Sequence, residues 1–293
     1  MMNPIKHRKL WYSISLLVIA PGAIALLLWG LKPSIDFSGG TLIEIEGTKD
    51  KGMIQELIEK SKIEGSTITI TENGATIRAK LIDENIHKSF KAELDKVEGA
   101  KELRVETVGP AVSKEITRNA FISVALASLL IVFYVAYSFR RVPKPASSWE
   151  FGIAAIIALI HDVLIVTGVF AILGHFFGVE IDILFITAIL TVVGFSVHDT
   201  IVIFDRIREN LIRNTGESFE EIVDRSILEM LPRTLSTSFL VWIILLILFL
   251  FGGETTKYFV LAILIGIFSG TYSSILNASP LLVTWQGFKR KRK

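Results

Sequence analysis

Long apolar stretches alternate with polar segments along the 293-residue chain. Six of these stretches are long enough to cross a bilayer as a helix, which requires roughly 17–25 residues. They run over Tyr12–Leu31, Asn119–Phe139, Phe151–Leu173, Ile181–Phe204, Thr234–Phe251 and Tyr258–Val283. The pattern therefore predicts an α-helical membrane protein with six transmembrane helices.

The largest polar segment, Lys32–Arg118, lies between the first two spans and carries similar numbers of basic and acidic residues. Strand-like and helix-like patterns follow one another within it. They predict a strand at Thr41–Glu46, a helix at Gly52–Ile63, strands at Thr67–Thr71 and Ala75–Leu81, a helix at Glu84–Val97 and a strand at Leu103–Val108. Asn73–Gly74 is typical of a two-residue hairpin turn. This β-α-β-β-α-β order predicts a small α+β ferredoxin-like domain that docks partners or handles substrate.

Basic residues are concentrated on one side of the predicted spans. They are Lys6, Arg8, Lys9, Arg140, Arg141, Lys144, Arg206, Arg208, Arg213, Arg225 and Lys289–Lys293. The two short loops on the other side contain a single Lys or Arg, Lys257. Because short loops rich in Lys and Arg stay in the cytoplasm, we expect both termini to be cytoplasmic and the large domain to be extracytoplasmic.

Four parts make up the predicted organisation. Residues 1–31 form the cytoplasmic N-terminus and the first helix, 32–118 the outer domain, 119–283 a five-helix membrane region, and 284–293 a basic cytoplasmic tail. The basic start and first apolar stretch also resemble a signal peptide. That stretch is longer than a signal core, however, and no small-residue cleavage site follows it.

An amphipathic pattern occupies the predicted cytoplasmic loop 205–232. Ser218 and Glu221 have the spacing of a capping box. Ile222, Val223 and Ile227 then lie in an apolar stripe. We expect a helix lying at the cytoplasmic membrane surface, with a solvated linker helix as the alternative.

Composition narrows the classes of function. The chain is 51% hydrophobic, has a net charge of +2 and contains no cysteine, and its mean hydropathy is +0.54. These values fit a membrane protein, give no reason to expect nucleic acid as a partner, and exclude disulfides and thiol catalysis. Gly39–Gly40 lacks the Lys and Ser/Thr of a phosphate loop, and the scattered histidines and acids lack metal-ligand spacing. We expect no enzymatic activity, no metal and no cofactor.

Asp199 and Arg233 are charged residues at or inside apolar runs. A charge within a membrane span costs at least ~2.5–3.5 kcal/mol, so it normally has a partner or faces water and marks a functional site. Ala188, Val192 and Ser196 share the helix face of Asp199, and their small size predicts packing against other helices. Burial favours a neutral carboxyl, whereas a nearby guanidinium favours the ionised form. Motion of Arg233 relative to Asp199 would therefore load and unload a proton; a static ion pair is the alternative.

Asp162, in the middle of the third span, is a second candidate for a proton pathway, and its neighbour His161 could share that pathway. The alternative is that Asp162 accepts a hydrogen bond from a Ser or Thr on another helix. His198 points about 100° away from Asp199 on an ideal helix. We interpret it as a packing histidine, with a proton relay as the alternative.

Polar residues also recur along the sixth predicted helix. They are Ser269, Thr271, Ser273, Ser274, Asn277 and Ser279. Such side chains could line a wet path or form hydrogen bonds between helices. Gly266 and Gly270 have the small-xxx-small spacing of a close helix contact, and we interpret them as packing residues.

Motifs at four places coincide with those of one family. Ile35–Thr41 reads Ile-Asp-Phe-Ser-Gly-Gly-Thr, Val108–Pro110 reads Val-Gly-Pro, Gly194–Asn210 ends the fourth span, and Pro232–Leu235 opens the fifth. The chain resembles the SecF family, the smaller subunit of the SecD–SecF protein-export factor, over nearly its whole length. The first motif, with Asp36, Gly39, Gly40 and Thr41, is shared with SecD, whereas the small outer domain favours SecF. Asp205 and Arg206 belong to the long and specific fourth-span motif.

This resemblance implies a bacterial cytoplasmic (inner) membrane protein of the resistance-nodulation-division type, which uses proton flow. Members pair with SecD as a heterodimer, and SecD would supply six further spans. Together they assist the SecYEG channel by drawing preproteins outward after ATP-driven insertion by SecA, and accessory subunits such as YajC and YidC can join. Asp199 and Arg233 match the family's proton-pathway positions, while position 198 is His where many relatives have Asn.

The expected function is thus an auxiliary subunit of the Sec preprotein translocase that uses protons as the coupling ion in late steps of export. One alternative is a passive assembly subunit whose charges hold SecD in place. Another is a homodimeric proton-coupled exporter of small molecules or lipids, which would work without SecD.

Overall fold

A computed structural model describes residues 4–71, 73–140, 142–213 and 216–291. Arg141, and Arg292 and Lys293 of the predicted basic tail, lie outside these residues. The chain divides into two compact units, which are described separately. The helical unit comprises Met1–Leu31, Ser123–Val179 and Leu184–Lys293, and the α/β unit comprises Lys32–Ile122 and Glu180–Ile183.

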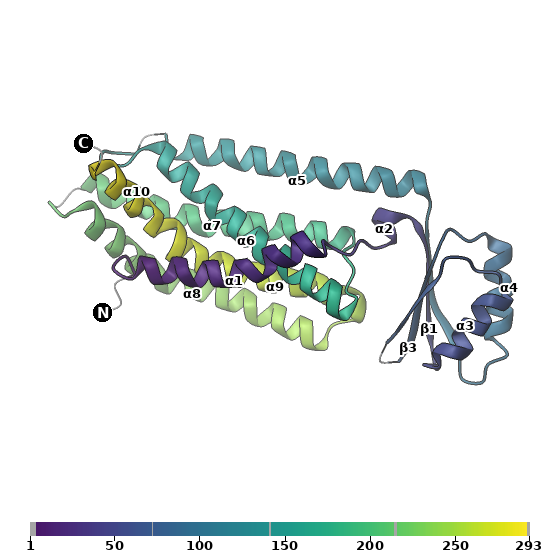
Figure 1. Cartoon of the computed structure of the whole chain (residues 1–293). Coiled ribbons are helices and arrows are strands. Elements are labelled where there is room, and N and C mark those ends of the chain that lie inside the picture. Colours follow the sequence, from purple (N-terminus) through teal and green to yellow (C-terminus); the bar gives the residue numbers. More distant parts are fainter. Residues whose placement is uncertain (1–3, 72, 141, 214–215, 292–293) are drawn as a thin grey trace. The chain divides into compact units, whose positions relative to one another are not determined.

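Six apolar helices within the described residues are long enough to span a bilayer (Figure 1). They are α1 (Arg8–Leu28), α5 (Pro110–Ser138), α6 (Ser148–Phe177), α7 (Ile183–Arg213), α8 (Phe219–Phe251) and the run Thr255–Lys289 that contains α9 and α10. By length and composition, the prediction of a helical membrane protein with six such helices is confirmed. Most helices extend beyond their predicted apolar runs because polar residues continue them at one or both ends.

Helix α8 differs most from its prediction. Instead of a separate helix at the membrane surface, the amphipathic segment is the first part of α8, which continues through Pro232. The predicted capping box is confirmed, with Ser218 as N-cap and Glu221 as its partner. Ile222, Val223 and Ile227 are 2%, 0% and 0% exposed in the protein core. The prediction of a surface helix was wrong because the apolar stripe packs against other helices rather than against lipid.

Aromatic side chains hold one end of the helical unit together. Phe139, after the last turn of α5, lies 5.2 Å from Phe151 of α6 and 5.7 Å from Phe204 of α7, between ring centroids. Phe151 and Phe204 are 4.9 Å apart and cross almost edge to face. All three are at most 1% exposed. The cluster therefore joins α5, α6 and α7 near residues 139–151 and 204.

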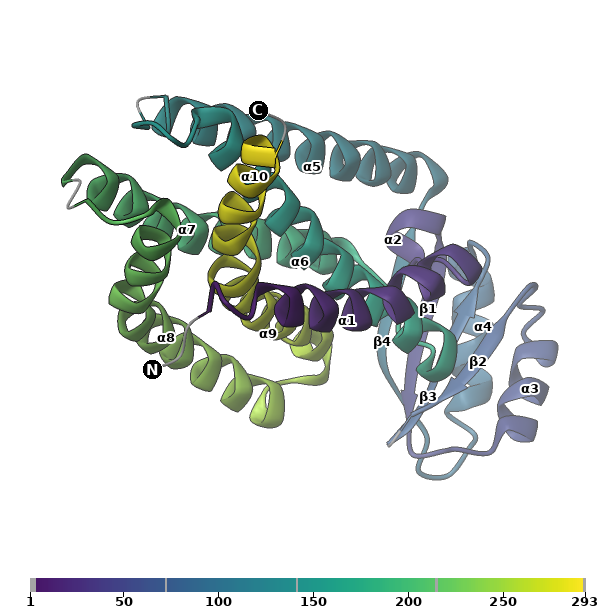
Figure 2. The ribbon, with the colours of Figure 1, turned by 60° about the vertical axis from the view of Figure 1, so that its left-hand side comes forward.

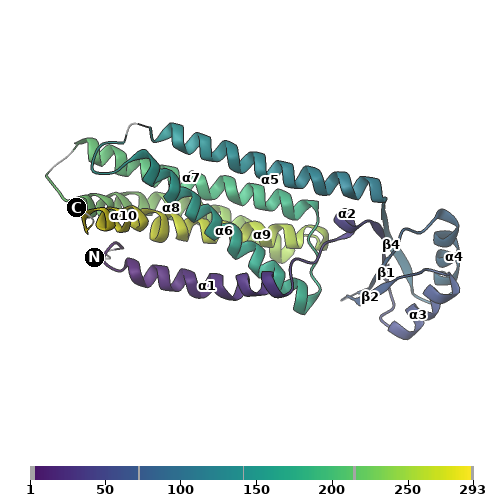
Figure 3. The same ribbon diagram turned by 45° about the horizontal axis from the view of Figure 1, so that its top comes forward.

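Helices α1 and α6 lie against each other (Figure 3), and glycines form part of their contact. A Cβ atom added at Gly168 would lie 2.6 Å from Cα of Gly22, and one added at Gly22 would lie 2.9 Å from Cα of Gly168. The absence of side chains at both positions lets the two backbones touch. Farther along, Trp29 stacks on His175 with a centroid distance of 4.0 Å.

The last membrane helix is interrupted by a change of helix type. Helix α9 (Glu254–Ser273) passes into a π-helical segment, Ser274–Ala278, and then into α10 (Ser279–Lys291). The three segments follow one another without an intervening loop, and the ribbon changes direction between α9 and α10 (Figure 2). A π segment inserts an extra residue into the turn and changes the faces to which the following side chains point, and such segments are frequent at functional sites.

One four-stranded antiparallel sheet forms the centre of the α/β unit. Its elements are β1 (Gly40–Glu46), α3 (Lys51–Lys60), β2 (Thr67–Ile70), β3 (Gly74–Ala79), α4 (Glu84–Leu94) and β4 (Lys101–Val108). The strand order is β2-β3-β1-β4. The predicted β-α-β-β-α-β order of elements is present, and Ile43, Ile77 and Phe90 are fully buried between the sheet and its helices.

Gly74 is placed differently from its prediction. It is the first residue of β3, opposite Glu46 of β1, instead of a turn residue. A Cβ atom at this position would collide with the backbone oxygen of Ile45. Close approach of two strand backbones therefore requires glycine here.

Candidate functional site

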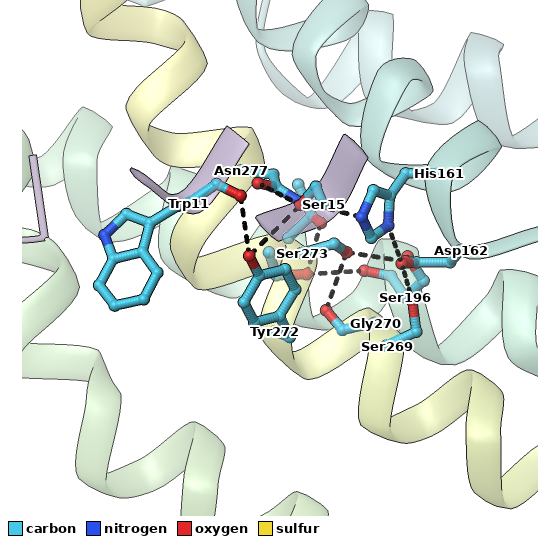
Figure 4. A network of polar contacts seen from close by, with 12 residues as sticks. Trp11, Ser15, His161, Asp162, Ser196, Ser269, Gly270, Tyr272, Ser273 and Asn277 are labelled. Atoms are coloured by element: carbon cyan, nitrogen blue, oxygen red, sulfur yellow. Dashed lines mark hydrogen bonds and ion pairs between the residues drawn. The ribbon is translucent and has the colours of Figure 1, made fainter. Parts of the chain in front are cut away.

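Asp162 is the centre of a buried polar network in the helical unit (Figure 4). It belongs to α6 and is 0% exposed. Its carboxylate accepts hydrogen bonds from Ser196 Oγ of α7 at 2.5 Å, and from Ser269 Oγ and Ser273 Oγ of α9 at 2.6 and 2.8 Å. The predicted alternative, hydrogen bonding to Ser or Thr on another helix, is confirmed. Asp162 thus joins three helices through one side chain.

His161 extends the network on the other side of Asp162. Its Nδ1 lies 2.8 Å from Asp162 Oδ1, and its Nε2 lies 3.1 Å from Asn277 Nδ2. An amide nitrogen can only donate, so Nε2 must accept and the ring proton is assigned to Nδ1. In this arrangement His161 donates its Nδ1–H to Asp162. The ring is 6% exposed, so its partners, not water, fix its orientation.

Asn277 carries the network to α1. Its Nδ2 donates to Ser15 Oγ at 2.7 Å, and Ser15 Oγ lies 3.3 Å from the hydroxyl of Tyr272. That hydroxyl donates to the backbone oxygen of Trp11 at 3.0 Å. Asn277 lies in the π segment. Helices α1, α6, α7 and α9 are therefore connected by a continuous set of hydrogen bonds through a place where the helix geometry changes (Figure 4).

Asp199 has a different environment, one turn farther along α7 than Ser196. Its side chain is 13% exposed. It accepts from Thr271 Oγ1 of α9 at 3.3 Å and from Ser238 Oγ of α8 at 3.4 Å. These distances are long for hydrogen bonds donated by a hydroxyl group, whereas Thr271 Oγ1 lies 2.8 Å from Ser238 Oγ. Asp199 is therefore positioned by α7, α8 and α9 but only weakly held.

The packing predicted for the Asp199 face of α7 is confirmed. Ala188 and Val192 are 0% exposed and Ser196 is 2% exposed. Gly266 of α9 faces Val192, and a Cβ atom added there would collide with the Val192 side chain. A Cβ atom at Gly270 would lie 3.2 Å from Cα of Ser196. The interpretation of Gly266 and Gly270 as a close helix contact is therefore also confirmed.

His198 does not pack in the helical core. Its side chain is 73% exposed, and its Nδ1 lies 3.4 Å from Asp199 Oδ1. The interpretation of His198 as a packing histidine is wrong for this chain. The cause is the 100° step between successive helix residues, which turns His198 outward when Asp199 faces α8 and α9.

Arg233 lies on α8 and is exposed. Among the residues that the structure describes, no ion pair joins it to Asp199. The contacts made by Asp199 are instead with Thr271, Ser238 and His198. An exchange of partners between Arg233 and Asp199 remains a prediction.

The polar residues of the sixth predicted helix form hydrogen bonds between helices. Besides the bonds to Asp162 and Asp199, Ser274 Oγ lies 2.8 Å from Thr200 Oγ1 and donates to the backbone oxygen of Ser196 at 3.3 Å. Ser279 differs, because its hydroxyl donates a hydrogen bond to the backbone oxygen of Ser274, which belongs to the same run of helical residues. The spacing of these residues in the sequence predicted the polar face. The hydrogen-bond partner of each residue could not be predicted, because it depends on how each helix is rotated about its axis.

In the α/β unit, the motif that contains Asp36 binds the segment Glu180–Ile183, which we call the 180–183 segment. Asp36 lies in a one-turn helix, α2 (Ile35–Ser38), and its Oδ2 accepts from the backbone N–H of Ile183 at 3.1 Å. Ile183 is the first residue of α7, so Asp36 caps that helix from outside it. Backbone hydrogen bonds of 2.8 Å from Ser34 N to Ile181 O and from Ile181 N to Lys32 O extend the contact.

Charged side chains strengthen this attachment. Glu180 Oε1 lies 2.8 Å from Arg78 Nη1 and 3.2 Å from Lys32 Nζ. Arg78, which belongs to β3, also donates to Ser38 Oγ at 2.5 Å. The 180–183 segment is therefore attached to both α2 and the sheet.

The remaining motif residues shape the turn into β1. Gly39 and Gly40 have φ values of 72° and 124°, and a Cβ atom at Gly40 would lie 2.5 Å from the backbone oxygen of Ala79. The buried Thr41 Oγ1 accepts from Ile82 N at 3.3 Å. The positive φ angles therefore account for Gly39 and Gly40, and the hydrogen bond from Ile82 accounts for Thr41.

Asp205 and Arg206 lie near the end of α7 and form ion pairs. Asp205 pairs with Arg208 at 2.7 Å. Arg206 contacts Glu209 on its own helix and Glu229 of α8, each at 2.6 Å. Arg206 therefore links α7 to α8.

Comparison with known proteins places this architecture in a family. Residues 89–287 match the family described as "Protein export membrane protein SecD/SecF, C-terminal". The protein translocase subunit SecF of Thermobaculum terrenum is 48% identical over 98% of this chain and 94% of that protein. The SecF subunit of Anaerolinea thermophila is 38% identical over 100% of this chain and 99% of that protein.

A longer relative and a solved structure give the same result. The protein translocase subunit SecDF of Thermus thermophilus is 38% identical over 96% of this chain, which spans 38% of that protein. The crystal structure of SecDF from the same organism superposes with a TM-score of 0.85 and 34% identity, over 98% of this chain and 39% of the solved chain. Matches of this extent in sequence and structure show that the chain belongs to the SecF family.

Proposed function

We propose that this chain is an auxiliary subunit of the Sec preprotein translocase, which works with SecD and uses the proton gradient to promote late steps of protein export. Family membership supports the first part, because the relatives are named as protein translocase subunits. The observation that supports the proton step is the weak attachment of Asp199. Its carboxylate is 13% exposed and has oxygen partners only at 3.3 and 3.4 Å.

A proton carrier must bind and release its proton with little rearrangement. Asp199 fits this requirement better than Asp162, which has three hydroxyl partners within 2.8 Å. Protonation of Asp199 would break only long hydrogen bonds, and Arg233 would favour its ionised form in another arrangement of α7 and α8. A proton that crosses 100 mV releases ~2.3 kcal/mol, which is enough to bias two helix arrangements.

The assembly that follows from the proposal has SecD as its first partner. In the SecDF relative, this chain corresponds to 38% of the protein, so SecD would supply the missing part as a separate subunit. SecYEG would be the channel, with YajC and YidC as further accessory subunits and preprotein as the substrate. The chain would lie in the bacterial cytoplasmic membrane with both termini inside, act without a cofactor or catalytic activity, and hold its ferredoxin-like domain outside.

The test uses vesicles that contain this chain, SecD, SecYEG and SecA. Proton flux and proton-dependent export of a preprotein are measured for the wild type, for Asp199→Asn and for Asp95→Asn. Asp95, an exposed residue at the end of α4, provides a control with the same chemical change. We expect Asp199→Asn to abolish flux and proton-dependent export while SecD still co-purifies. Flux that survives Asp199→Asn would rule out the relay.

A passive assembly subunit is the second candidate. It is favoured by the lack of an ion pair between Arg233 and Asp199 among the described residues and by the firmly bonded Asp162, because neither feature requires a moving proton. In this case Asp199→Asn or Arg233→Ala would release SecD during purification. Proton flux through assembled complexes would then be the same for wild type and variants.

A further inference from the structure

A cavity of about 740 Å³ opens in the helical unit between the C-terminal end of α5, the second half of α7 and the middle of α8. Ile201, Val202 and Met230 contribute to its apolar wall, whereas Arg140 and Arg233 contribute positive charge. Asp162, Asp199 and their hydrogen-bond partners do not line it. The cavity is therefore separate from the polar networks described above.

Some of the charge in the cavity is already neutralised. Arg206 and Arg208 also line it, together with Asp205 and Glu209. Arg206 lies 2.6 Å from Glu209, and Arg208 lies 2.7 Å from Asp205. The charges of these four lining side chains sum to zero, and Arg206 and Glu209 have further partners outside the lining, Glu229 and Arg213.

Arg140 and Arg233 are not balanced in this way. Within the described part of the chain, neither guanidinium has a carboxylate within 4.0 Å, the limit for an ion pair. Arg140 Nη1 donates to the backbone oxygen of Tyr137 at 3.1 Å, and its guanidinium lies 3.8 Å from the centroid of the Tyr137 ring. These contacts orient the guanidinium without cancelling its charge. The cavity therefore has an excess of two positive charges and would attract an anion.

The surroundings indicate which kind of anion fits. Tyr134 and Tyr137 are 58% and 66% exposed near the end of α5, and exposed tyrosines at a helix end are typical of the headgroup depth of a membrane. The outer surface of α5 continues from there with exposed Leu130 and Phe133. A small soluble anion would gain nothing from the apolar wall or from this surface. A phospholipid would place its phosphate at the arginines and an acyl chain along the apolar side chains.

We propose that this cavity binds an anionic phospholipid through its phosphate, with Arg140 and Arg233 as the cationic ligands. Arginine suits the role because its planar guanidinium donates two parallel hydrogen bonds to phosphate oxygens. Basic pockets between membrane helices are known to take anionic headgroups. The inference does not rest on the proposed proton pathway, and Arg140 allows it to be tested without changing Asp199 or Arg233.

The experiment measures lipid retained by the purified chain in detergent. Phosphatidylglycerol and phosphatidylcholine with identical acyl chains are added, and bound lipid is counted by native mass spectrometry. We expect retention of phosphatidylglycerol over phosphatidylcholine. Arg140→Gln should weaken phosphatidylglycerol binding about fivefold, since one cation near a membrane surface contributes about 1 kcal/mol. Arg140→Lys, which keeps the charge, should weaken it less.

Arg118→Gln is the matched control, because Arg118 lies on the same helix as the Tyr137 end of the cavity, α5, and is exposed but does not line the cavity. It should leave binding unchanged. Equal retention of both lipids, or equal effects of Arg140→Gln and Arg118→Gln, would overturn the proposal. Displacement of phosphatidylglycerol by inorganic phosphate at similar concentration would show a site for free anions instead. Loss of the bound lipid when SecD is co-purified would show that the partner subunit occupies the cavity.

Discussion

Asp162 and Asp199 are carboxylates in adjacent helices, but their hydrogen bonds differ in number and length. Asp162 is fully buried and has hydroxyl partners at 2.5–2.8 Å, whereas the hydroxyl partners of Asp199 lie at 3.3 and 3.4 Å. Short hydrogen bonds to a buried charge contribute more to stability than long ones near the surface. Asp162 should therefore contribute more to the stability of the fold than Asp199 does. The structural contribution of Asp199 is small, which is compatible with a functional role.

We expect Asp162→Asn to destabilise the helical unit by about 2 kcal/mol, because an amide group directs N–H hydrogens at serine or histidine donors in place of an acceptor. Asp199→Asn should cost less than about 1 kcal/mol, because its weaker bonds are replaced by similar ones. The measurement is the thermal unfolding midpoint of the chain in detergent, with Asp95→Asn as a surface control. Equal shifts for Asp162→Asn and Asp199→Asn would contradict this division of roles.

Both carboxylates could be identified from the sequence, because a charge inside an apolar run is costly. The class of partner for Asp162 was also predictable, since serine and threonine recur on the last helix. Its individual partners were not, because they depend on how each helix is rotated. The link from His161 through Asn277 to Ser15 was missed altogether. This link passes through Asn277, which lies in the π segment. No sequence pattern predicted that segment.

Glycines determine how closely the helices approach each other. Gly266 of α9 faces Val192, and Gly168 of α6 faces Gly22 of α1. The Gly168 contact is backbone against backbone, so neither partner can move a side chain out of the way. Gly152, on the same helix as Gly168, has no atom within 4 Å of its added Cβ position.

Gly168→Ala should therefore destabilise the chain by about 1–3 kcal/mol, because a methyl group at this contact forces α1 away from α6. Gly152→Ala should be neutral or stabilise by up to about 1 kcal/mol, because alanine is the better helix former. Thermal unfolding in detergent distinguishes the two variants. If Gly152→Ala proved as destabilising as Gly168→Ala, loss of glycine itself, and not the helix contact, would be responsible.

At the level of elements, apolar length was sufficient to find the six long apolar helices of the described residues, but not where they end. The predicted cytoplasmic loop ended at Pro232 and the fifth span began after it, yet α8 continues through Pro232. Proline removes one backbone donor, which a helix tolerates when neighbouring packing compensates for the loss. Burial of Ile222, Val223 and Ile227 in the core provides that packing. Such a tertiary effect cannot be read from local sequence.

For the whole molecule, the distribution of charge predicts an orientation. Basic residues are concentrated at the end of the helical unit where Arg8 of α1 pairs with Glu220 of α8 at 2.7 Å. By the positive-inside rule we expect this end to be cytoplasmic and the α/β unit to be extracytoplasmic. The chain contains no cysteine, so a single introduced cysteine can be labelled without background.

Two exposed positions test this orientation. Lys91 lies on α4 of the α/β unit and Arg213 at the end of α7, with side chains 55% and 62% exposed. A maleimide that cannot cross membranes should label Lys91→Cys in intact spheroplasts and Arg213→Cys only after permeabilisation. Both variants should react in detergent, which checks that each cysteine is accessible. The reverse pattern in intact spheroplasts would invert the proposed orientation.

The attachment of the 180–183 segment has a mechanical consequence. Ile183 begins the helix that carries Asp199, and its amide is held by Asp36, while Glu180 is held by Arg78 of the sheet. The first turn of α7 therefore cannot slide along its axis unless these bonds rupture or the sheet is pulled with it. An axial shift of this first turn would therefore be transmitted to strand β3 through Glu180 and Arg78.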